Sequence, residues 1–453
     1  MGTDDTRSGS KVVFALPRFG TSVVLGIEGF ALFTLYSQAY GLNPFMTTVA
    51  QAAGYLTIAA SQFAFGWISD HTKTRLGRRK PYILGMTPLL TLSFILMLLP
   101  ALVLPDMEDQ WALFSWLLLW DVVFRASYAV TTPYQAWMAE QFSVDERPKV
   151  SQLQNVFNYI GNGLMAILTL VVFTAAFREI DQDVSAIPMN FMLIIIGFGA
   201  AVMALFYVVA AVMPTEPQGE IKSDLVASLK TTVKNKNFMI VVFMQGISGF
   251  AWVIITAVML TYTEAVLALN TIEYLIVSVT LLLGIFIFLH VWRVMIDKSG
   301  KKTVLLRVFL LGIAFLPVTL VGLVPMDNRL VFGIIFILGI AAILGGWYLF
   351  PYIIYADIAE EEQQSETGEL RAGIYVGFPS IILNIFQAAG ILLLGAIASL
   401  PDITVGDLSF SVGLVAWGPI CTLILLASYV YTRRLVILDF DLPTGDDRDE
   451  SQP

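Results

Sequence analysis

Charged residues are scarce in this sequence of 453 residues, at 13% of the chain, whereas a soluble domain carries about a quarter. The single cysteine, Cys421, excludes an internal disulfide. The two histidines, His71 and His290, do not have the HExxH spacing of a zinc site, and the sequence contains neither a GxSxG elbow nor a P-loop with its lysine. These shortages argue against a soluble domain and against an enzyme.

Hydrophobic residues are abundant instead, at 57% of the chain, and the mean hydropathy is +0.76. A helix needs about 20 apolar residues to cross a bilayer. The sequence therefore predicts an all-α polytopic membrane protein with twelve transmembrane helices, over residues 12–38, 44–69, 82–104, 111–139, 152–177, 190–213, 237–264, 272–295, 303–325, 329–356, 372–399 and 409–432.

The two ends of the sequence are polar. The opening MGTDDTRSGS is acidic rather than basic, and the first apolar run is too long for the core of a signal peptide, so we expect no cleavable leader. The closing DFDLPTGDDRDESQP carries part of the formal charge of −9 and is typical of a solvated tail. The negative charge therefore does not imply a cationic partner.

The distribution of Lys and Arg predicts the orientation in the membrane, because these residues concentrate in cytoplasmic loops. If both termini are cytoplasmic, eighteen Lys and Arg residues fall in or beside cytoplasmic segments, and only Arg178 and Arg329 fall in the opposite loops. The sequence thus predicts cytoplasmic N and C termini in a plasma membrane. A distribution that topology explains gives no support to nucleic-acid binding.

The longest internal polar segment, PTEPQGEIKSDLVASLKTTVKNKN, divides the predicted spans into two sets of six. The predicted organisation, two six-helix pseudo-repeat bundles, is an N-terminal segment (1–11), a first bundle (12–213), a linker with an amphipathic helix (214–236), a second bundle (237–432) and an acidic cytoplasmic tail (433–453). Duplication at this scale is typical of secondary transporters.

A compact basic hairpin follows the second predicted span, and a similar segment, WRVMIDKSGKKTVLL, follows the eighth. In both, an Asp is followed by a Gly and a basic pair. We predict a latch that ties neighbouring helix ends at the cytoplasmic face and holds one conformation. The alternative is that the basic residues only set topology. The predicted latch residues are Asp70, Gly77, Arg78, Arg79, Asp297, Gly300 and Lys301.

The first hairpin, GWISDHTKTRLGRRKPYI, resembles the major facilitator superfamily, and within it the glycoside–pentoside–hexuronide:cation symporter branch (melibiose and sucrose carriers). Its string S-D-x-x-x-x-R-x-G-R-R-x-P, from Ser69 to Pro81, is closest to the sucrose-type carriers. The segments YADIAEEEQQSETGELRAGIYVG and TTPYQAWMAEQFSVDER are similar to further segments of the branch. The resemblance implies two six-helix bundles around a cavity lined by spans one, four, seven and ten. It also implies alternating access and substrates that are sugars or glycosides driven by Na⁺ or H⁺; some relatives carry lysolipids.

The sequence departs from the sodium-coupled members of the branch. Their sodium-ligand positions fall on Ile58, Ser61 and Gln62, and a hard cation needs a cluster of oxygens that Ile58 does not supply. Their sugar-binding acids fall on Ser22 and near Thr131, and their span-eleven lysine falls near Asn384. We therefore expect H⁺ rather than Na⁺ as the coupling ion, with no metal and no other cofactor.

Three charged residues lie well inside predicted spans, where ionisable groups are costly and functional by default. Glu28 lies near the middle of span one, and Asp121 and Arg125 are four residues apart on one face of span four. A Glu28–Arg125–Asp121 cluster facing the cavity predicts proton coupling. The alternatives are a permanent ion pair and direct contact with the substrate. Glu264 lies near a span end, where snorkelling explains it.

Polar and aromatic residues mark candidate substrate contacts. The asparagine stripe of span five suits sugar hydroxyls, although such amides also join helices. Trp347 and Tyr348 of span ten suit stacking on a pyranose, although such residues also gather at membrane interfaces. The candidates are Asn155, Asn158, Asn162, Gln245, Trp252, Trp347, Tyr348, Asn384 and Gln387.

The sequence therefore predicts a transporter of a sugar or glycoside, coupled to protons and acting as a monomer. One alternative is a carrier of lysolipids or other amphiphiles, for which the cavity would be more apolar. Another is a sensing receptor that binds its ligand without moving it. A measurement of flux separates the receptor from the carriers.

Overall fold

The computed structural model describes residues 3–143, 146–215, 233–364 and 372–437. Most of the predicted linker (216–232) and most of the predicted acidic tail (438–453) lie outside these ranges, as does part of the span ten–eleven signature (365–371). The predicted N-terminal segment is largely helical, because the first helix, α1, runs from Thr3 to Ala15.

The first half of the chain forms one set of long helices. Its elements are α1 (Thr3–Ala15), α2 (Pro17–Thr34), η1 (Leu35–Ala39), α3 (Pro44–His71), α4 (Lys80–Leu98), η2 (Pro100–Leu102), α5 (Gln110–Tyr128), α6 (Thr131–Gln141), α7 (Arg147–Ile167), η3 (Leu168–Phe173), α8 (Thr174–Gln182) and α9 (Met189–Val212).

The second half forms a similar set. Its elements are α11 (Lys236–Thr261), η4 (Tyr262–Val266), α12 (Thr271–Ser299), α13 (Lys301–Phe315), η5 (Leu316–Leu323), α14 (Arg329–Gln364), α15 (Ala372–Ala398), the strands β1 (Asp402–Val405) and β2 (Leu408–Ser411), and α16 (Gly413–Leu435). Each of the twelve predicted spans overlaps one of these helices or a continuous series of them, which confirms the all-helical prediction.

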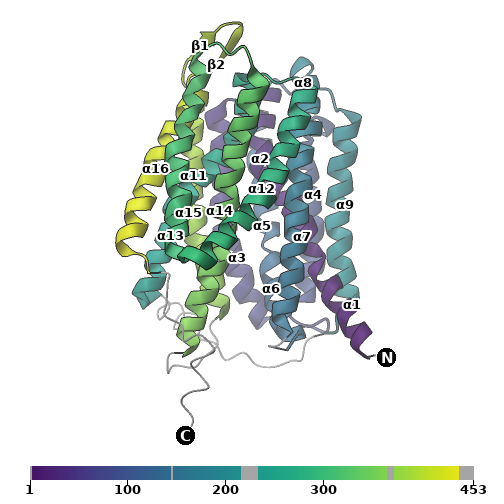
Figure 1. Cartoon of the computed structure of the whole chain (residues 1–453). Helices are drawn as coiled ribbons and strands as arrows, with labels where there is room; N and C mark the ends of the chain where they lie inside the picture. Colours follow the sequence, from purple (N-terminus) through teal and green to yellow (C-terminus); the bar gives the residue numbers. More distant parts are fainter. Residues whose placement is uncertain (1–2, 144–145, 216–232, 365–371, 438–453) are drawn as a thin grey trace.

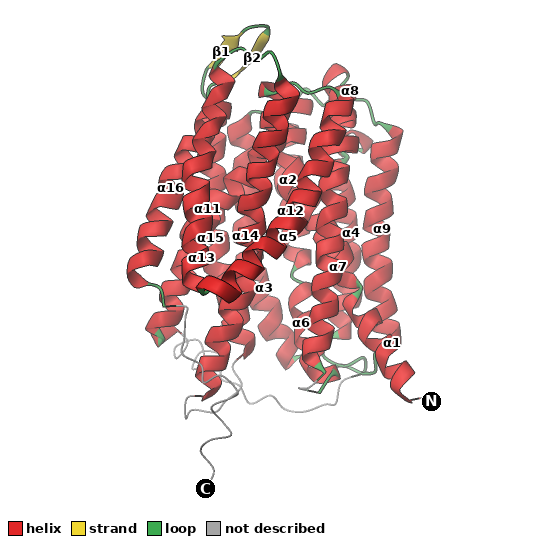
Figure 2. Cartoon of the chain, viewed as in Figure 1, coloured by secondary structure: helices red, strands yellow, loops and turns green. Residues whose placement is uncertain are grey.

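The long helices run side by side, as Figures 1 and 2 show. First-half helices such as α4, α7 and α9 lie on one side of the molecule, and second-half helices such as α11, α13 and α16 lie on the other (Figure 1). The end that carries α8 and the β1–β2 hairpin is called the hairpin end below. The opposite end, with α1 and α6, is called the α1 end.

Side-chain caps fix where several helices begin, because the first backbone N–H groups of a helix lack internal partners. The Asn43 side chain accepts from the N–H of Phe45 at 2.9 Å and begins α3. Asp109 caps α5 in the same way, and Asn270 with Glu273 forms a capping box at α12. Local chemistry therefore sets these boundaries within one or two residues of the predicted ones.

One predicted boundary at the hairpin end differs by four residues from the observed one. The sequence predicts a twelfth span that begins at residue 409, but residues 402–411 form an antiparallel hairpin and α16 begins at Gly413. Gly406 supplies the turn, with φ of +61°. Alternation of apolar and polar residues around Phe410 favours a short strand, which a search for long apolar runs cannot detect.

The two halves meet along α3 and α7. Ten helical segments of the described chain are apolar enough to cross a membrane by composition, and α3 and α7 are the predicted spans missing from that set. Gln62 of α3 accepts a hydrogen bond from Ser380 of α15 at 2.6 Å. A side chain at Gly163 of α7 would overlap Leu282 of α12. These helices tolerate more polar residues because part of their surface faces another helix rather than lipid.

Candidate functional site

A cluster of three charged residues lies in the middle of the first half, between α2 and α5. Arg125 Nη2 donates to Glu28 Oε1 at 2.5 Å, and Arg125 Nε lies 3.7 Å from Asp121 Oδ1. The exposed fractions of Glu28, Asp121 and Arg125 are 1%, 0% and 3%. The structure thus brings together the three residues that the sequence singled out, and two carboxyl groups share one guanidinium.

Helix α3 completes this cluster with residues that the sequence analysis did not single out. The Arg125 guanidinium lies 4.0 Å from the centre of the Tyr55 ring, a distance typical of a cation–π contact. The neighbouring Gly54 lies directly against the Asp121 carboxyl group, so a side chain there would overlap it. Neither contact follows from spacing within one helix, because both depend on how α3 packs on α5.

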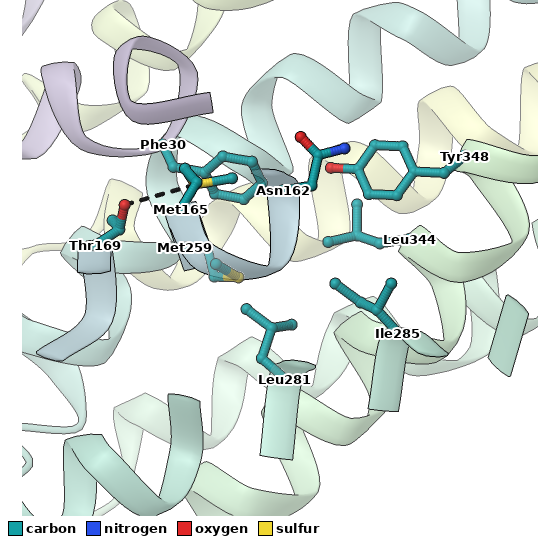
Figure 3. Close-up of a pocket in the computed structure, with 9 residues that line it drawn as sticks. All are labelled: Phe30, Asn162, Met165, Thr169, Met259, Leu281, Ile285, Leu344 and Tyr348. Carbon is teal, nitrogen blue, oxygen red and sulfur yellow. Dashed lines mark hydrogen bonds between the residues drawn. The ribbon is translucent and has the colours of Figure 1, made fainter. Parts of the chain in front are cut away.

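A small cavity lies between the two halves, with a volume of about 20 Å³, which is room for about one water molecule. The amide of Asn162 and the hydroxyl of Tyr348 point toward one another across it (Figure 3). The rest of the lining is mainly apolar; the residues are Phe30, Asn162, Met165, Thr169, Met259, Leu281, Ile285, Leu344 and Tyr348.

The charged cluster does not line this cavity, contrary to the prediction that both spans would present it there. Glu28 and Phe30 both belong to α2, but residues two apart do not share a helix face. Glu28 faces Arg125 of α5, whereas Phe30 lines the cavity. Helix α2 therefore lies between the cluster and the cavity, and a residue of α2 contacts each of them.

The predicted asparagine stripe of α7 divides into different environments. Asn158 accepts a hydrogen bond from Ser22 of α2, an interhelical contact. Asn162 lines the cavity, and Asn155 is half-buried one to two turns before it. Asn158 thus joins two helices, whereas a substrate contact by Asn162 stays a prediction.

The aromatic residues predicted to contact the substrate also lie in different environments. Trp347 stacks on Trp252 of α11, with ring centres 4.9 Å apart, and this pairing occupies one face of each ring. Tyr348, the next residue, lines the cavity instead. Of the predicted aromatic candidates, Tyr348 is the one on the cavity wall.

The three remaining polar candidates lie on α11 and α15. Gln245 is buried, with 2% of its surface exposed. Asn384 donates to the Ser380 carbonyl at 2.7 Å and to its hydroxyl at 3.0 Å, and Ser380 in turn donates to Gln62. Gln387 is half-buried beside Gly249. Asn384 therefore belongs to a chain of hydrogen bonds that joins the two halves.

The basic hairpin of the first half forms ion pairs at the α1 end. Arg79 Nη2 lies 2.5 Å from Asp70 Oδ1 and 2.7 Å from Oε1 of Glu140, at the end of α6. Arg78 also pairs with Glu140, at 3.1 Å. Burial lowers the pKa of Arg79, but the Glu140 and Asp70 carboxylates outweigh it and raise that pKa. Glu140, which the sequence analysis missed, is the residue that ties the hairpin to α6.

The similar segment of the second half, WRVMIDKSGKKTVLL, turns with the same backbone geometry as the basic hairpin of the first half. Gly77 and Gly300 have φ of +91° and +79°, the left-handed region that favours glycine. Asp297 is exposed near the end of α12, and Lys301 begins α13. The repeat predicted from the sequence is therefore present in the backbone at both turns.

An interaction at the hairpin end joins the two halves. Arg178 Nη2 of α8 donates to the Leu269 carbonyl at 2.6 Å, and its Nε lies 3.4 Å from Glu264 Oε1. The same guanidinium lies 5.4 Å from the centre of the Tyr274 ring. Glu264 is 17% exposed and paired across the interface, so its role differs from the snorkelling expected for it.

The helical fold, the interface between two halves and the cavity within it define a membrane transporter. The family model described as MFS/sugar transport protein matches residues 13–430, and the chain belongs to this family. The chain is therefore an integral membrane protein of a transporter family rather than an enzyme. Its substrate is a small molecule.

A curated relative is an uncharacterized symporter, sll1374, of Synechocystis sp. (strain ATCC 27184 / PCC 6803 / Kazusa), 24% identical over 177 residues. The match covers 38% of this chain and 32% of the symporter, so the chain matches about a third of that relative's length.

Solved structures share the fold at low sequence identity. The nucleoside transporter NupG has a TM-score of 0.61 at 13% identity, covering 94% of this chain and 98% of that one. A D-xylose-proton symporter has a TM-score of 0.63 at 12% identity, covering 95% and 96%. A bacterial homolog of the human lysosomal transporter Spinster, inward-facing and unoccupied, has a TM-score of 0.62 at 12% identity, covering 96% and 98%.

Proposed function

We propose that this protein moves a sugar or glycoside across the membrane by alternating access, driven by protons. The observation that carries the proposal is the buried Glu28–Arg125–Asp121 cluster behind the cavity wall, since an ionisable cluster in mid-membrane is a functional site by default. The family description, the symporter relative and the fold shared with a D-xylose-proton symporter support it.

In this proposal α2 transmits the state of the cluster to the cavity. A proton changes the charge around Arg125 on one face of α2, and substrate contacts Phe30 on another. The Arg178 interaction closes the hairpin end, and the Arg79–Glu140 latch stabilises the α1 end of the first half. We place both termini and the latch on the cytoplasmic side of the plasma membrane, with one chain as the working unit.

The coupling ion in this proposal is H⁺ rather than Na⁺. Ile58 is an apolar residue with 4% of its surface exposed, so the position where sodium-coupled relatives supply an oxygen has none. Gln62 Oε1 already accepts the Ser380 hydroxyl. These environments suit helix packing better than a sodium site.

A specific observation favours a second candidate, a carrier of lysolipids or other amphiphiles. Six of the nine cavity-lining residues are Phe, Met, Leu or Ile. A sugar requires several hydrogen-bonding groups, and Asn162, Thr169 and Tyr348 are the polar ones of this lining.

Counterflow in sodium-free proteoliposomes distinguishes the candidates. Vesicles loaded with one unlabelled monosaccharide, disaccharide or lysolipid are diluted into a labelled trace of the same compound. Transient accumulation of a labelled sugar supports the proposal, and accumulation of lysolipid alone supports the second candidate. Binding without any counterflow would identify a sensing receptor and overturn both.

A further inference from the structure

The Asp121 carboxyl group is buried without a hydrogen-bond donor. Its exposed fraction is 0%, and neither oxygen has a donor in hydrogen-bonding geometry among the residues that the structure describes; its electrostatic partner is Arg125. The 3.7 Å separation from Arg125 Nε is an ion-pair contact beyond hydrogen-bonding distance. An ionised carboxylate in such a place is strongly destabilised, because neither water nor a donor replaces its solvation.

Glu28 is in a different position, although it shares the same arginine. Its Oε1 accepts a direct hydrogen bond from Arg125 Nη2 at 2.5 Å. A charge-assisted bond of this kind stabilises the ionised form of Glu28. With Glu28 and Arg125 paired, an ionised Asp121 would leave one uncompensated negative charge in the cluster.

The other titratable groups around Asp121 do not supply a donor. Tyr36 of η1 interacts electrostatically with Asp121 but donates its hydroxyl to the Met97 carbonyl at 2.7 Å. Tyr55 of α3 presents its ring to Arg125. Helix α4 packs on α5 through rings such as Phe94 against Phe124, and its titratable residues, Lys80 and Tyr82, lie in its first turn.

Gly54 shapes this environment. A Cβ there would overlap Asp121 Oδ2 and would also approach Cγ of Arg125 at 3.1 Å. The backbone of α3 therefore covers the carboxyl group closely and excludes water from it. A larger residue would push the carboxyl group out of this position.

We propose that Asp121 is the proton-binding residue of the cluster, that Glu28 and Arg125 form a lasting ion pair, and that Gly54 is the positioning residue for Asp121. The step is transfer of a proton that originates as hydronium in the bulk solvent to the Asp121 carboxylate, which leaves a water molecule in the solvent and takes the net charge of the cluster from −1 to zero. This inference rests on the proposed proton coupling and assigns it to the acid of α5 rather than that of α2.

Infrared difference spectroscopy of the full chain in proteoliposomes tests this assignment without any substrate. Spectra are compared between about pH 6, where solvated carboxyl groups are already ionised, and about pH 10. We expect a neutral-carboxyl band that shifts when aspartate is labelled with ¹³C at its carboxyl group, does not shift with labelled glutamate, and is absent in Asp121→Asn. No such band, a band that shifts with labelled glutamate alone, or a band that persists in Asp121→Asn would overturn the assignment.

Gly54→Ala keeps both carboxyl groups, so it provides a second test of the assignment if Asp121→Asn does not fold. We expect its aspartate band to change midpoint by about one pH unit or more, because the carboxyl group is displaced. Gly85→Ala is the matched control, since Gly85 lies on α4 with nothing within 4 Å of an added Cβ. An unchanged midpoint in Gly54→Ala would contradict the positioning role. A chain that shows the band but moves no sugar would leave the proton site standing and remove the sugar function.

Discussion

Arg178 of α8 donates a hydrogen bond of 2.6 Å to the carbonyl of Leu269, which joins the first half of the chain to the second at the hairpin end. Ala268, the residue before Leu269, has φ of +46°, a conformation unusual for a residue other than glycine. The connection between α11 and α12 is thus held in a costly conformation where it meets Arg178. The alternating access that we propose would require this contact to break.

Arg178→Met should favour opening at the hairpin end. The pair is partly exposed, so we expect a loss of about 1 kcal/mol and a several-fold rise in the open population. Thr34 and Thr261, which share a buried 2.8 Å hydrogen bond between the halves, provide the probe position. In a Cys421→Ala background, Thr34→Cys should react faster with an impermeant maleimide when Arg178→Met is present. An unchanged rate would show that this contact does not hold the hairpin end closed.

Glu140→Gln should weaken the latch at the α1 end. Arg79 has 2% of its surface exposed and would keep Asp70 and the Ser69 hydroxyl as partners. We expect a loss of about 2 kcal/mol in stability, because a nearly buried guanidinium loses one of its two carboxylates. Thermal unfolding in detergent measures this, with the exposed Glu108→Gln as control. An equal effect of both substitutions would contradict a structural latch.

Acid should release α1 from the first half. Lys11 lies 3.0 Å from Glu146, and hydrogen bonds from Lys11 and Ser143 lower the pKa of Glu146 from 4.5 to about 2. Because the folded value is lower, this contribution is fully present above about pH 4.5 and is lost as the pH falls toward 2. Hydrogen exchange of α1 should rise over that window in the wild type. In Glu146→Gln the exchange should already be high at neutral pH, and a pH rise of the same size in this variant would contradict the assignment.

The two asparagines Asn158 and Asn162 should have separable effects. Asn162→Ala removes a polar group from the cavity and should raise KM for a transported sugar about tenfold, the equivalent of one hydrogen bond. Asn158→Ala removes the contact with Ser22 and should lower Tm with little effect on KM. Sugar titrations and melting curves on both variants test this. The reverse pattern would move the binding site away from the cavity.

The sequence predicted the helical framework well because lipid exposure imposes long apolar runs. It also predicted the Asp121–Arg125 pairing, since residues four apart share a helix face. Contacts between helices were harder to predict, because they depend on rotation and packing. Gly54 against Asp121, Glu140 against Arg79 and the placement of Glu28 on the face of α2 away from the cavity are all of this kind. The β1–β2 hairpin was missed because its strands are too short to register as apolar runs.

Accumulation of a sugar under an inward proton gradient, in sodium-free proteoliposomes, tests the central claim most directly. The account predicts that the wild type concentrates the sugar in proportion to the gradient. It also predicts that Asp121→Asn loses this concentration, because its cluster can no longer take up the proton. Accumulation in Asp121→Asn equal to the wild type, or no accumulation in the wild type until sodium is added, would contradict proton coupling through this cluster.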